Sequence, residues 1–245
     1  MTSTPGPPDR LGRRQSGRTP ESYRLQPRRA LVDDVYEAVK ALVMDQVVAA
    51  GERMSIDGLA RDLGVSPTPV REALTRLESE GLATKEALKG YRAAPLLTRE
   101  EFDDLFAFRR LIEPWAAARA AERIDDVGRA LLAEELGSAS APAGTSYDDY
   151  RRLTEHDQRF HSLVAELSGS PQARRALERT HGHLHIFRLH FERSTGHETL
   201  TEHAAVVEAI RSGDPAAAEA AMIHHLEAAM NERIRTIYDT DGPEG

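Results

Sequence analysis

The sequence predicts a mainly α-helical protein, with an N-terminal helix-turn-helix unit and small β-hairpin followed by an all-α bundle of about six helices. Apolar residues recur at helical spacing along most of the 245 residues. Glycines and Ser or Asp residues at cap positions divide these stretches into short helices. A single Lys89-Gly90 turn between two short extended runs supplies the hairpin.

Composition divides the chain into four segments. Residues 1–29 carry seven Arg against two acids and are rich in Pro, Gly and Ser, so we expect a flexible basic arm over 1–27. The helix-turn-helix unit is expected over 28–96, the bundle over 97–238 and a short tail over 239–245. The net charge of −8 disfavours nucleic acid as a partner, unless local Arg residues overrule it.

The N-terminal unit is predicted to contain three helices before its hairpin. Apolar positions four residues apart, such as Val35 and Val39, predict a helix over about 30–50, ended by a glycine. Two shorter helices, each closed by glycine, follow over 56–63 and 66–81.

The helix over 66–81 has an unusual first turn and a polar outer face. Pro67 and Pro69 are harmless there, because the first amides of a helix have no internal acceptor, and Ser66 is expected to cap it. Its outer face carries Thr68, Arg71, Glu72, Thr75 and Arg76. A helix N-terminus also attracts phosphate. This pattern favours a helix-turn-helix that binds DNA, although an ordinary helical hairpin with a solvated face would show the same periodicity.

The bundle is predicted from stretches with helical apolar spacing over 99–123, 126–136, 147–168, 171–193, 198–212 and 215–237. Thr98 and Glu101 form a capping box before the first of them. Ser146, Ser170 and Asp214 stand at cap positions, and the last two are followed by proline at the first helical position.

Several ionisable residues fall on the apolar stripes of these helices. Asp157 and His161 share one stripe, and His203 and His225 lie on the inner faces of two later helices. Arg109 lies on the stripe of the first bundle helix. A buried charge is costly unless it is paired or bound to a metal. One carboxylate and three imidazoles suit Zn²⁺, or Ni²⁺ in an octahedral site, with a simple Asp157–His161 core pair as the alternative.

Two further features exclude whole classes of protein. The chain has no cysteine, which excludes disulfides, Cys-bound zinc and thiol nucleophiles. No apolar run approaches the ~18 residues that a membrane span needs, and the N-terminus lacks the apolar stretch of a signal peptide. We therefore expect a cytoplasmic protein with no membrane partner.

The stretch ARDLGVSPTPVREALTRLESEGL resembles the winged-helix DNA-binding domain of the GntR family of bacterial transcription regulators. The resemblance covers about 30–95 and implies a winged helix-turn-helix that binds double-stranded DNA. Many members carry Arg where Pro67 stands, so Arg71 is the main candidate for reading base sequence. With the polar outer face and the wing tip, the candidate DNA contacts are Ser66, Thr68, Arg71, Thr75, Arg76, Lys89, Gly90 and Tyr91.

LTEHDQRFHSLVAELSGS, AAMIHHLEAAM and FAFRRLIEPWAAARAA resemble the effector-binding, FCD-type domain of the FadR subgroup of that family. The resemblance covers about 99–236. In many members one Asp and three His bind a metal at the floor of a ligand cavity, which maps here to Asp157, His161, His203 and His225. Zn²⁺ is the expected ion, with Ni²⁺ or Mn²⁺ as alternatives. Arg109 falls where the family has a cavity-facing Arg, which implies a clamp for a small organic acid.

The expected function is therefore a regulator, acting as a repressor, whose operator affinity a small metabolite controls. Reading a palindromic operator requires two recognition helices about one helical turn apart, so a homodimer is expected. One alternative is a metal sensor, in which the ion itself is the signal. The other is a metal-dependent hydrolase, which would need a base beside a bound water; we expect Glu155 and Glu202 to point away from such a site.

Overall fold

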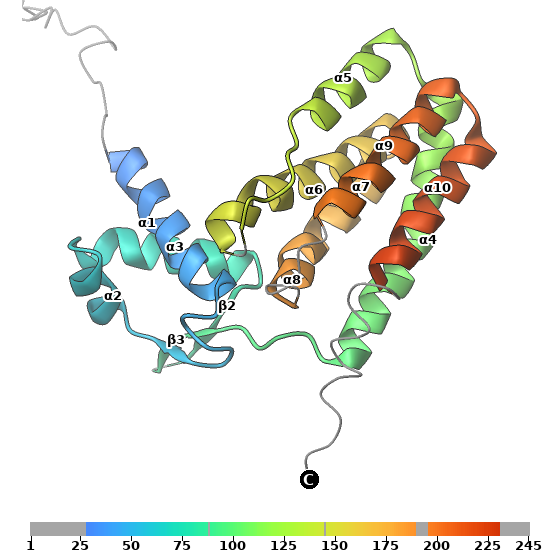
Figure 1. The fold of residues 1–245 in the computed structure, drawn as a ribbon. Helices are drawn as coiled ribbons and strands as arrows, with labels where there is room; N and C mark the ends of the chain where they lie inside the picture. Colours follow the sequence, from blue (N-terminus) through green and yellow to red (C-terminus); the bar gives the residue numbers. More distant parts are fainter. Residues whose placement is uncertain (1–27, 88, 145, 190–195, 231–245) are drawn as a thin grey trace, which may run out of the picture.

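A computed structural model describes residues 28–87, 89–144, 146–189 and 196–230. The predicted basic arm over 1–27 and the predicted tail over 239–245 lie outside this range. Figure 1 shows two parts in contact, a smaller N-terminal one that contains the sheet and a larger bundle formed by the helices after residue 98.

The N-terminal part contains helices α1 (Arg28–Met44), α2 (Ile56–Asp62) and α3 (Pro67–Ser79), with strands β1 (Arg53–Met54), β2 (Ala83–Glu86) and β3 (Gly90–Ala93). The strands form an antiparallel sheet in the order β1-β3-β2, with Thr84 opposite Arg92. This confirms the predicted hairpin, and Gly90 has a φ of 94°, which favours glycine. The sequence pattern does not predict β1, because two residues are too few to show alternation.

Helix α1 is shorter than its predicted span of 30–50. The backbone of Gln46 is left-handed, with a φ of 53°, and the Val48 amide donates back to the Leu42 carbonyl over 3.0 Å. Val47 continues the apolar pattern, but its side chain is 68% exposed. The residues after Met44 therefore form a turn, which the apolar spacing had concealed.

Helix α3 presents its apolar face inward, as predicted. Val70, Leu74 and Leu77 are fully buried and belong to one core cluster with Val39 of α1. Helices α1 and α3 pack closely against each other. This packing fixes α3 so that its polar face, with Arg71, is left to solvent.

The second part contains α4 (Arg99–Arg123), α5 (Asp126–Gly137), α6 (Tyr147–Leu167), α7 (Pro171–Thr180), α8 (Gly182–Leu189), α9 (Gly196–Ser212) and α10 (Pro215–Glu227). Helix α4 runs beside α10 and also packs against α6 (Figure 1). Phe160, Ile210 and Met222 are fully buried in the core between these helices. The mainly α fold class is thus confirmed, and none of the described helices is both long and apolar enough to cross a membrane.

The capping residues predict several helix starts correctly. The Thr98 hydroxyl accepts from the Glu101 amide at 3.2 Å, while the Glu101 carboxylate accepts from the Thr98 amide at 2.9 Å. Ser146 forms a second capping box at the start of α6. Ser170 and Asp214 cap α7 and α10, each followed by proline at the start of the helix.

The prediction of one helix over 171–193 is wrong. The backbone is left-handed at His181, with a φ of 45°, which separates α7 from α8. The Thr180 hydroxyl accepts from the Gly182 amide at 3.2 Å and donates to the Leu177 carbonyl at 2.7 Å. The apolar spacing continues through the break and does not reveal it. Residues 190–193 of that prediction, like those after 230 in the last helix, lie outside the described part.

Helix α8 also packs against the N-terminal part. Leu184 belongs to the same buried cluster as the apolar face of α3, and Phe187 packs against that cluster. Tyr147, at the start of α6, is buried there as well, and its amide donates to the Asp45 carboxylate at 2.5 Å. The two parts are therefore in direct contact through α8 and the start of α6 (Figure 1).

Candidate functional site

Four of the predicted site residues meet inside the bundle. Asp157 and His161 come from α6, His203 from α9 and His225 from α10. All four are buried, and one ligand atom of each lies within 4.8 Å of those of the others. They converge because each occupies an inward position of its helix, next to core residues such as Phe160.

The nitrogen atoms that face one another in this cluster are the Nε2 atoms. His161 Nε2 lies 3.6 Å from Asp157 Oδ1, and His203 Nε2 lies 3.7 Å from the same oxygen. His225 Nε2 lies 3.3 Å from His161 Nε2. One carboxylate oxygen and three imidazole nitrogens thus point at a common centre.

The opposite nitrogen of each ring contacts another side chain. His161 Nδ1 lies 2.5 Å from a Glu113 oxygen, and His225 Nδ1 lies 2.8 Å from a Glu202 oxygen. His203 Nδ1 lies 2.9 Å from His156 Nε2. Partners of this kind hold a metal-binding ring in place and select the nitrogen it presents. The Glu202 carboxylate, on α9, contacts the side of the His225 ring opposite to the Nε2 that faces the centre of the cluster.

The cluster could hold a divalent metal ion. His203 is completely buried, yet its Nε2 has no hydrogen-bond partner among the described residues, which is costly unless something binds there. Three imidazole nitrogens and one carboxylate oxygen form a set that Zn²⁺ accepts in tetrahedral sites, and Ni²⁺ also favours imidazole.

The charges around the cluster are strongly coupled. Burial raises the pKa of Glu113, but the charges of Arg109 and His161 outweigh it and hold that pKa at about 2. Burial lowers the pKa of His161, but Glu113 and Asp157 outweigh it and raise that pKa to about 9. Burial lowers the pKa of His203 well below its ordinary value. In the metal-free protein at neutral pH, His161 is therefore charged and His203 is neutral.

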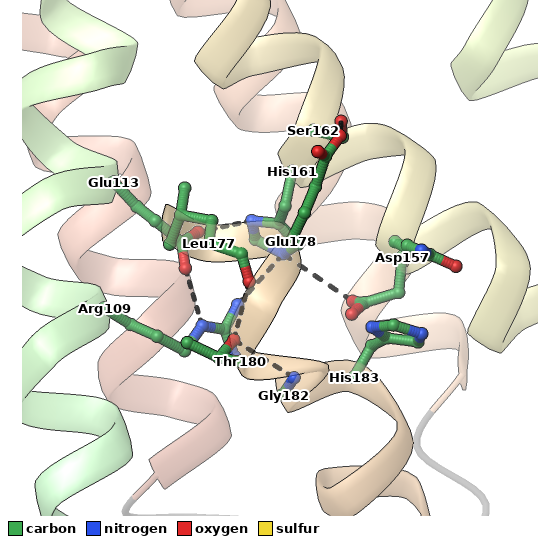
Figure 2. A pocket seen from close by; sticks show the side chains of 11 residues that line it. Arg109, Glu113, Asp157, His161, Ser162, Leu177, Glu178, Thr180, Gly182 and His183 are labelled. Atoms are coloured by element: carbon green, nitrogen blue, oxygen red, sulfur yellow. Dashed lines mark hydrogen bonds and ion pairs between the residues drawn. The ribbon is translucent and has the colours of Figure 1, made fainter. Parts of the chain in front are cut away.

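Arg109 lies beside the cluster and lines a small pocket with two of its members, Asp157 and His161 (Figure 2). Its Nε donates to Glu113 Oε1 at 2.6 Å, and its Nη2 lies 3.2 Å from His161 Nε2. The cavity measures about 40 Å³. Its other lining residues come from α6, α7 and the start of α8: Asp157, Gln158, Ser162, Leu177, Glu178, Thr180, Gly182 and His183.

Glu113 and His183 are among the charged or polar members of this pocket that the sequence analysis does not predict. Glu113 is four residues after Arg109 on the same helical face, so the spacing could have revealed it. His183 lines the pocket because α8 begins anew at Gly182, and the unpredicted break at His181 hides that placement.

The candidate DNA-binding residues at the start of α3 are exposed. Ser66, Thr68 and Arg71 all face solvent, and Arg71 forms no ion pair with the described residues. Ser66 occupies the cap position, but its side chain makes no capping hydrogen bond. The usual donor is the third amide of the helix, which is missing here because Pro69 has no N–H. The Ser66 hydroxyl is therefore left on the exposed face.

Two other candidate DNA contacts, Arg76 and Thr75, already interact with other residues of the chain. Arg76 stacks on the Tyr36 ring, with the guanidinium carbon 3.6 Å from its centre, and pairs with Asp33 at 3.4 Å. The Thr75 hydroxyl donates to the Arg71 carbonyl and lies 3.2 Å from the Tyr91 hydroxyl.

At the wing, the ring of Tyr91 is buried in the core, whereas Lys89 and Gly90 are exposed at the tip. Lys89 lies 3.8 Å from a Glu86 oxygen, and 74% of its side chain is accessible. Lys89 therefore offers an accessible charge to a phosphate at the tip of the wing.

Two family models match the chain. The model described as bacterial regulatory proteins of the gntR family matches residues 31–92, and the FCD domain model matches residues 104–228. The first match spans α1 to β3, with the exposed face of α3. The second spans Arg109 and all four residues of the Asp/His cluster.

Several known proteins with similar sequences are named as transcriptional regulators, and a solved structure shares the fold. An uncharacterised HTH-type regulator from Bacillus subtilis, YdhC, is 25% identical over 78% of this chain and 85% of its own. A protein assigned to regulation of the L-lactate dehydrogenase operon in Escherichia coli is 29% identical over 81% and 84%. The solved structure of Escherichia coli McbR/YncC has the same fold, with a TM-score of 0.60 at 20% identity, over 86% of this chain and 98% of the other.

Proposed function

Since the chain belongs to the GntR family of bacterial regulatory proteins and carries an FCD domain, we propose that a small organic acid and a divalent metal ion together control its affinity for DNA. The chain is a transcriptional regulator and not an enzyme. Our proposal assigns DNA binding to residues 28–96 and ligand binding to residues 97–238, in a protein that works in the cytoplasm.

The observation that carries the proposal is the buried cluster of Asp157, His161, His203 and His225 beside Arg109. A metal ion there, Zn²⁺ first and Ni²⁺ or Mn²⁺ as alternatives, would supply a positive centre at the floor of the pocket. Arg109 would add a guanidinium that binds a carboxylate with two hydrogen bonds.

We propose a small organic acid as the effector because the pocket is small and because Arg109 and a bound metal ion would attract a carboxylate. The cavity of about 40 Å³ suits a molecule of few non-hydrogen atoms. The name of one relative links it to the L-lactate dehydrogenase operon, and lactate is such an acid. Ser162 and Thr180, which also line the pocket, offer hydroxyl groups for further polar contacts.

The winged helix-turn-helix would bind a palindromic operator as a homodimer, because two α3 helices are needed to read two half-sites. Helix α4 supports this proposal, since its Leu111 and Trp115 side chains are 78% and 44% exposed and lie one turn apart. An apolar surface of this kind is typical of an interface between protein chains. We propose repression as the outcome, because a dimer bound at a promoter blocks access to the DNA it covers.

Operator binding with and without ligands tests this proposal. The DNA is the promoter region of the protein's own gene, and gel shifts are run on metal-free protein, with Zn²⁺ alone, and with Zn²⁺ plus a panel of small carboxylic acids. We expect one acid to change affinity only when metal is present. Release by metal alone would support the ion as signal, and no specific shift under any condition would contradict the proposal.

A further inference from the structure

His156 lies beside the metal cluster without being one of its four members. It is completely buried on α6, immediately before Asp157. Its Nε2 lies 2.9 Å from His203 Nδ1, and its Nδ1 lies 2.9 Å from an oxygen of Glu135 on α5. Glu135, His156 and His203 thus form a continuous hydrogen-bonded chain that ends at the cluster.

The carboxylate at the outer end determines where the protons lie. An ionised Glu135 can only accept, so His156 Nδ1 must donate to it. A neutral His156 then has a free lone pair on Nε2, which accepts from His203 Nδ1. The neutral ring of His203 consequently carries its only proton on Nδ1, and its Nε2 keeps a lone pair directed at the cluster.

We propose that Glu135 and His156 are positioning residues that fix the tautomer of His203, so that its Nε2 can bind the metal ion. The inference rests on the metal site of the proposed function and adds residues that act through His203 without touching the ion. His203 Nε2 is buried and has no hydrogen-bond partner among the described residues, as expected of a nitrogen whose lone pair is kept for a metal ion.

Glu135 is itself held in place at the edge of the bundle. Arg159 Nε donates to both of its oxygens, at 3.2 and 3.0 Å. Glu135 lines a groove of about 690 Å³ between α5, α6 and α7, which shares Gln158, Ser162 and Glu178 with the ligand pocket. Glu135 on α5 therefore reaches the His203 ring only through His156. The rings of His161 and His225 instead contact a carboxylate directly.

Nitrogen NMR of the metal-free protein tests the tautomer without any bound ion. Long-range ¹H–¹⁵N spectra of histidine-labelled protein are expected to show a protonated Nδ1 and an unprotonated Nε2 for His203. Glu135→Leu removes the acceptor and should disturb this pattern, while Glu135→Gln keeps an amide oxygen as acceptor and should restore it. Glu134→Leu, at the exposed neighbouring position, is the matched control and should leave the pattern unchanged. A protonated Nε2 in the wild type would overturn the inference.

Metal affinity is the second readout. By titration with Zn²⁺ against a competing chelator, Glu135→Leu and His156→Phe should bind about 10–100-fold more weakly than wild type. Glu135→Gln and Glu134→Leu should stay close to wild type. If Glu135→Leu binds Zn²⁺ as tightly as wild type, the positioning role is refuted, whatever the behaviour of His156→Phe. If the wild type binds no metal, the proposed metal site fails, and the NMR pattern still decides whether the hydrogen-bonded chain exists.

Discussion

Arg188 of α8 donates a hydrogen bond from Nη2 to the carbonyl oxygen of Ala94, at 2.8 Å, across the contact between the two parts of the chain. The Arg188 side chain is completely buried, and the Gln46 side chain donates to its backbone carbonyl at 3.3 Å. The first residues of the same helix, Gly182 and His183, line the ligand pocket. Helix α8 therefore contacts the pocket at its start and the DNA-binding part at its end.

Arg188→Met tests whether α8 connects ligand binding to DNA binding. Arg188 remains charged at neutral pH, since burial lowers its pKa only to about 10, and no carboxylate of the described residues pairs with it. The variant should bind Zn²⁺ normally, while the change in operator affinity on ligand binding should shrink from the usual range of about 5–150-fold towards none. Arg175→Met, at an exposed position of α7, is the control; an undiminished ligand effect in Arg188→Met would refute the role of α8.

Arg71→Ala should weaken specific DNA binding. Its guanidinium is exposed on α3 and forms no ion pair with the described residues, so it is free to contact a base edge. A bidentate contact with guanine contributes about 1–3 kcal/mol of discrimination. Fluorescence anisotropy on operator and random DNA should show the loss mainly on the operator. Arg129→Ala, on α5, is the control for charge, and equal affinity of Arg71→Ala for the operator would contradict the prediction.

Arg109→Ala should abolish the response to the organic acid while leaving DNA affinity without ligand unchanged. The substitution removes a pocket-facing guanidinium but also leaves Glu113 buried with only His161 beside it, so thermal unfolding must be measured in parallel. Arg110→Ala, at the next position, is exposed and serves as the control. A normal effector response in a folded Arg109→Ala protein would exclude the carboxylate clamp.

Metal affinity should rise with pH up to about 9. In the metal-free protein the pKa of His161 is raised to about 9, so at neutral pH its ring holds two protons, and an ion binding at Nε2 must displace one of them. Displacement of one proton weakens binding by about tenfold for each pH unit below that value. Calorimetric Zn²⁺ titrations in buffers with different ionisation enthalpies measure the released protons. Affinity that is constant between pH 6 and 8 would contradict this coupling.

The sequence predicts the arrangement of the elements better than their ends. Capping residues such as Thr98 and Asp214 act locally, so they mark helix starts without knowledge of the fold. Gln46 and His181 have left-handed backbones and lie where helices end, although the apolar spacing continues past them. Neither is a glycine or a proline, so the sequence does not mark these ends. Strand β1 exists only because β3 lies beside it, which no local pattern reveals.

In the candidate site, too, the sequence predicts some features and misses others that depend on the fold. Helical spacing places Asp157, His161, His203 and His225 on inward faces, and the fold brings those faces together. The partners behind the rings come from other helices, as Glu135 on α5 does for His156. Such contacts depend on how the helices pack, so spacing along one helix cannot predict them.

Metal content is the measurement that tests the central claim most directly. Purified protein is exposed to Zn²⁺, Ni²⁺ or Mn²⁺, dialysed and examined by elemental analysis, beside a His203→Ala/His225→Ala double variant and a His224→Ala control at the exposed neighbouring position. We predict one tightly bound ion per chain in the wild type and in His224→Ala, and its loss in the double variant. A wild-type chain without metal, or a folded double variant that keeps its ion, would contradict the account.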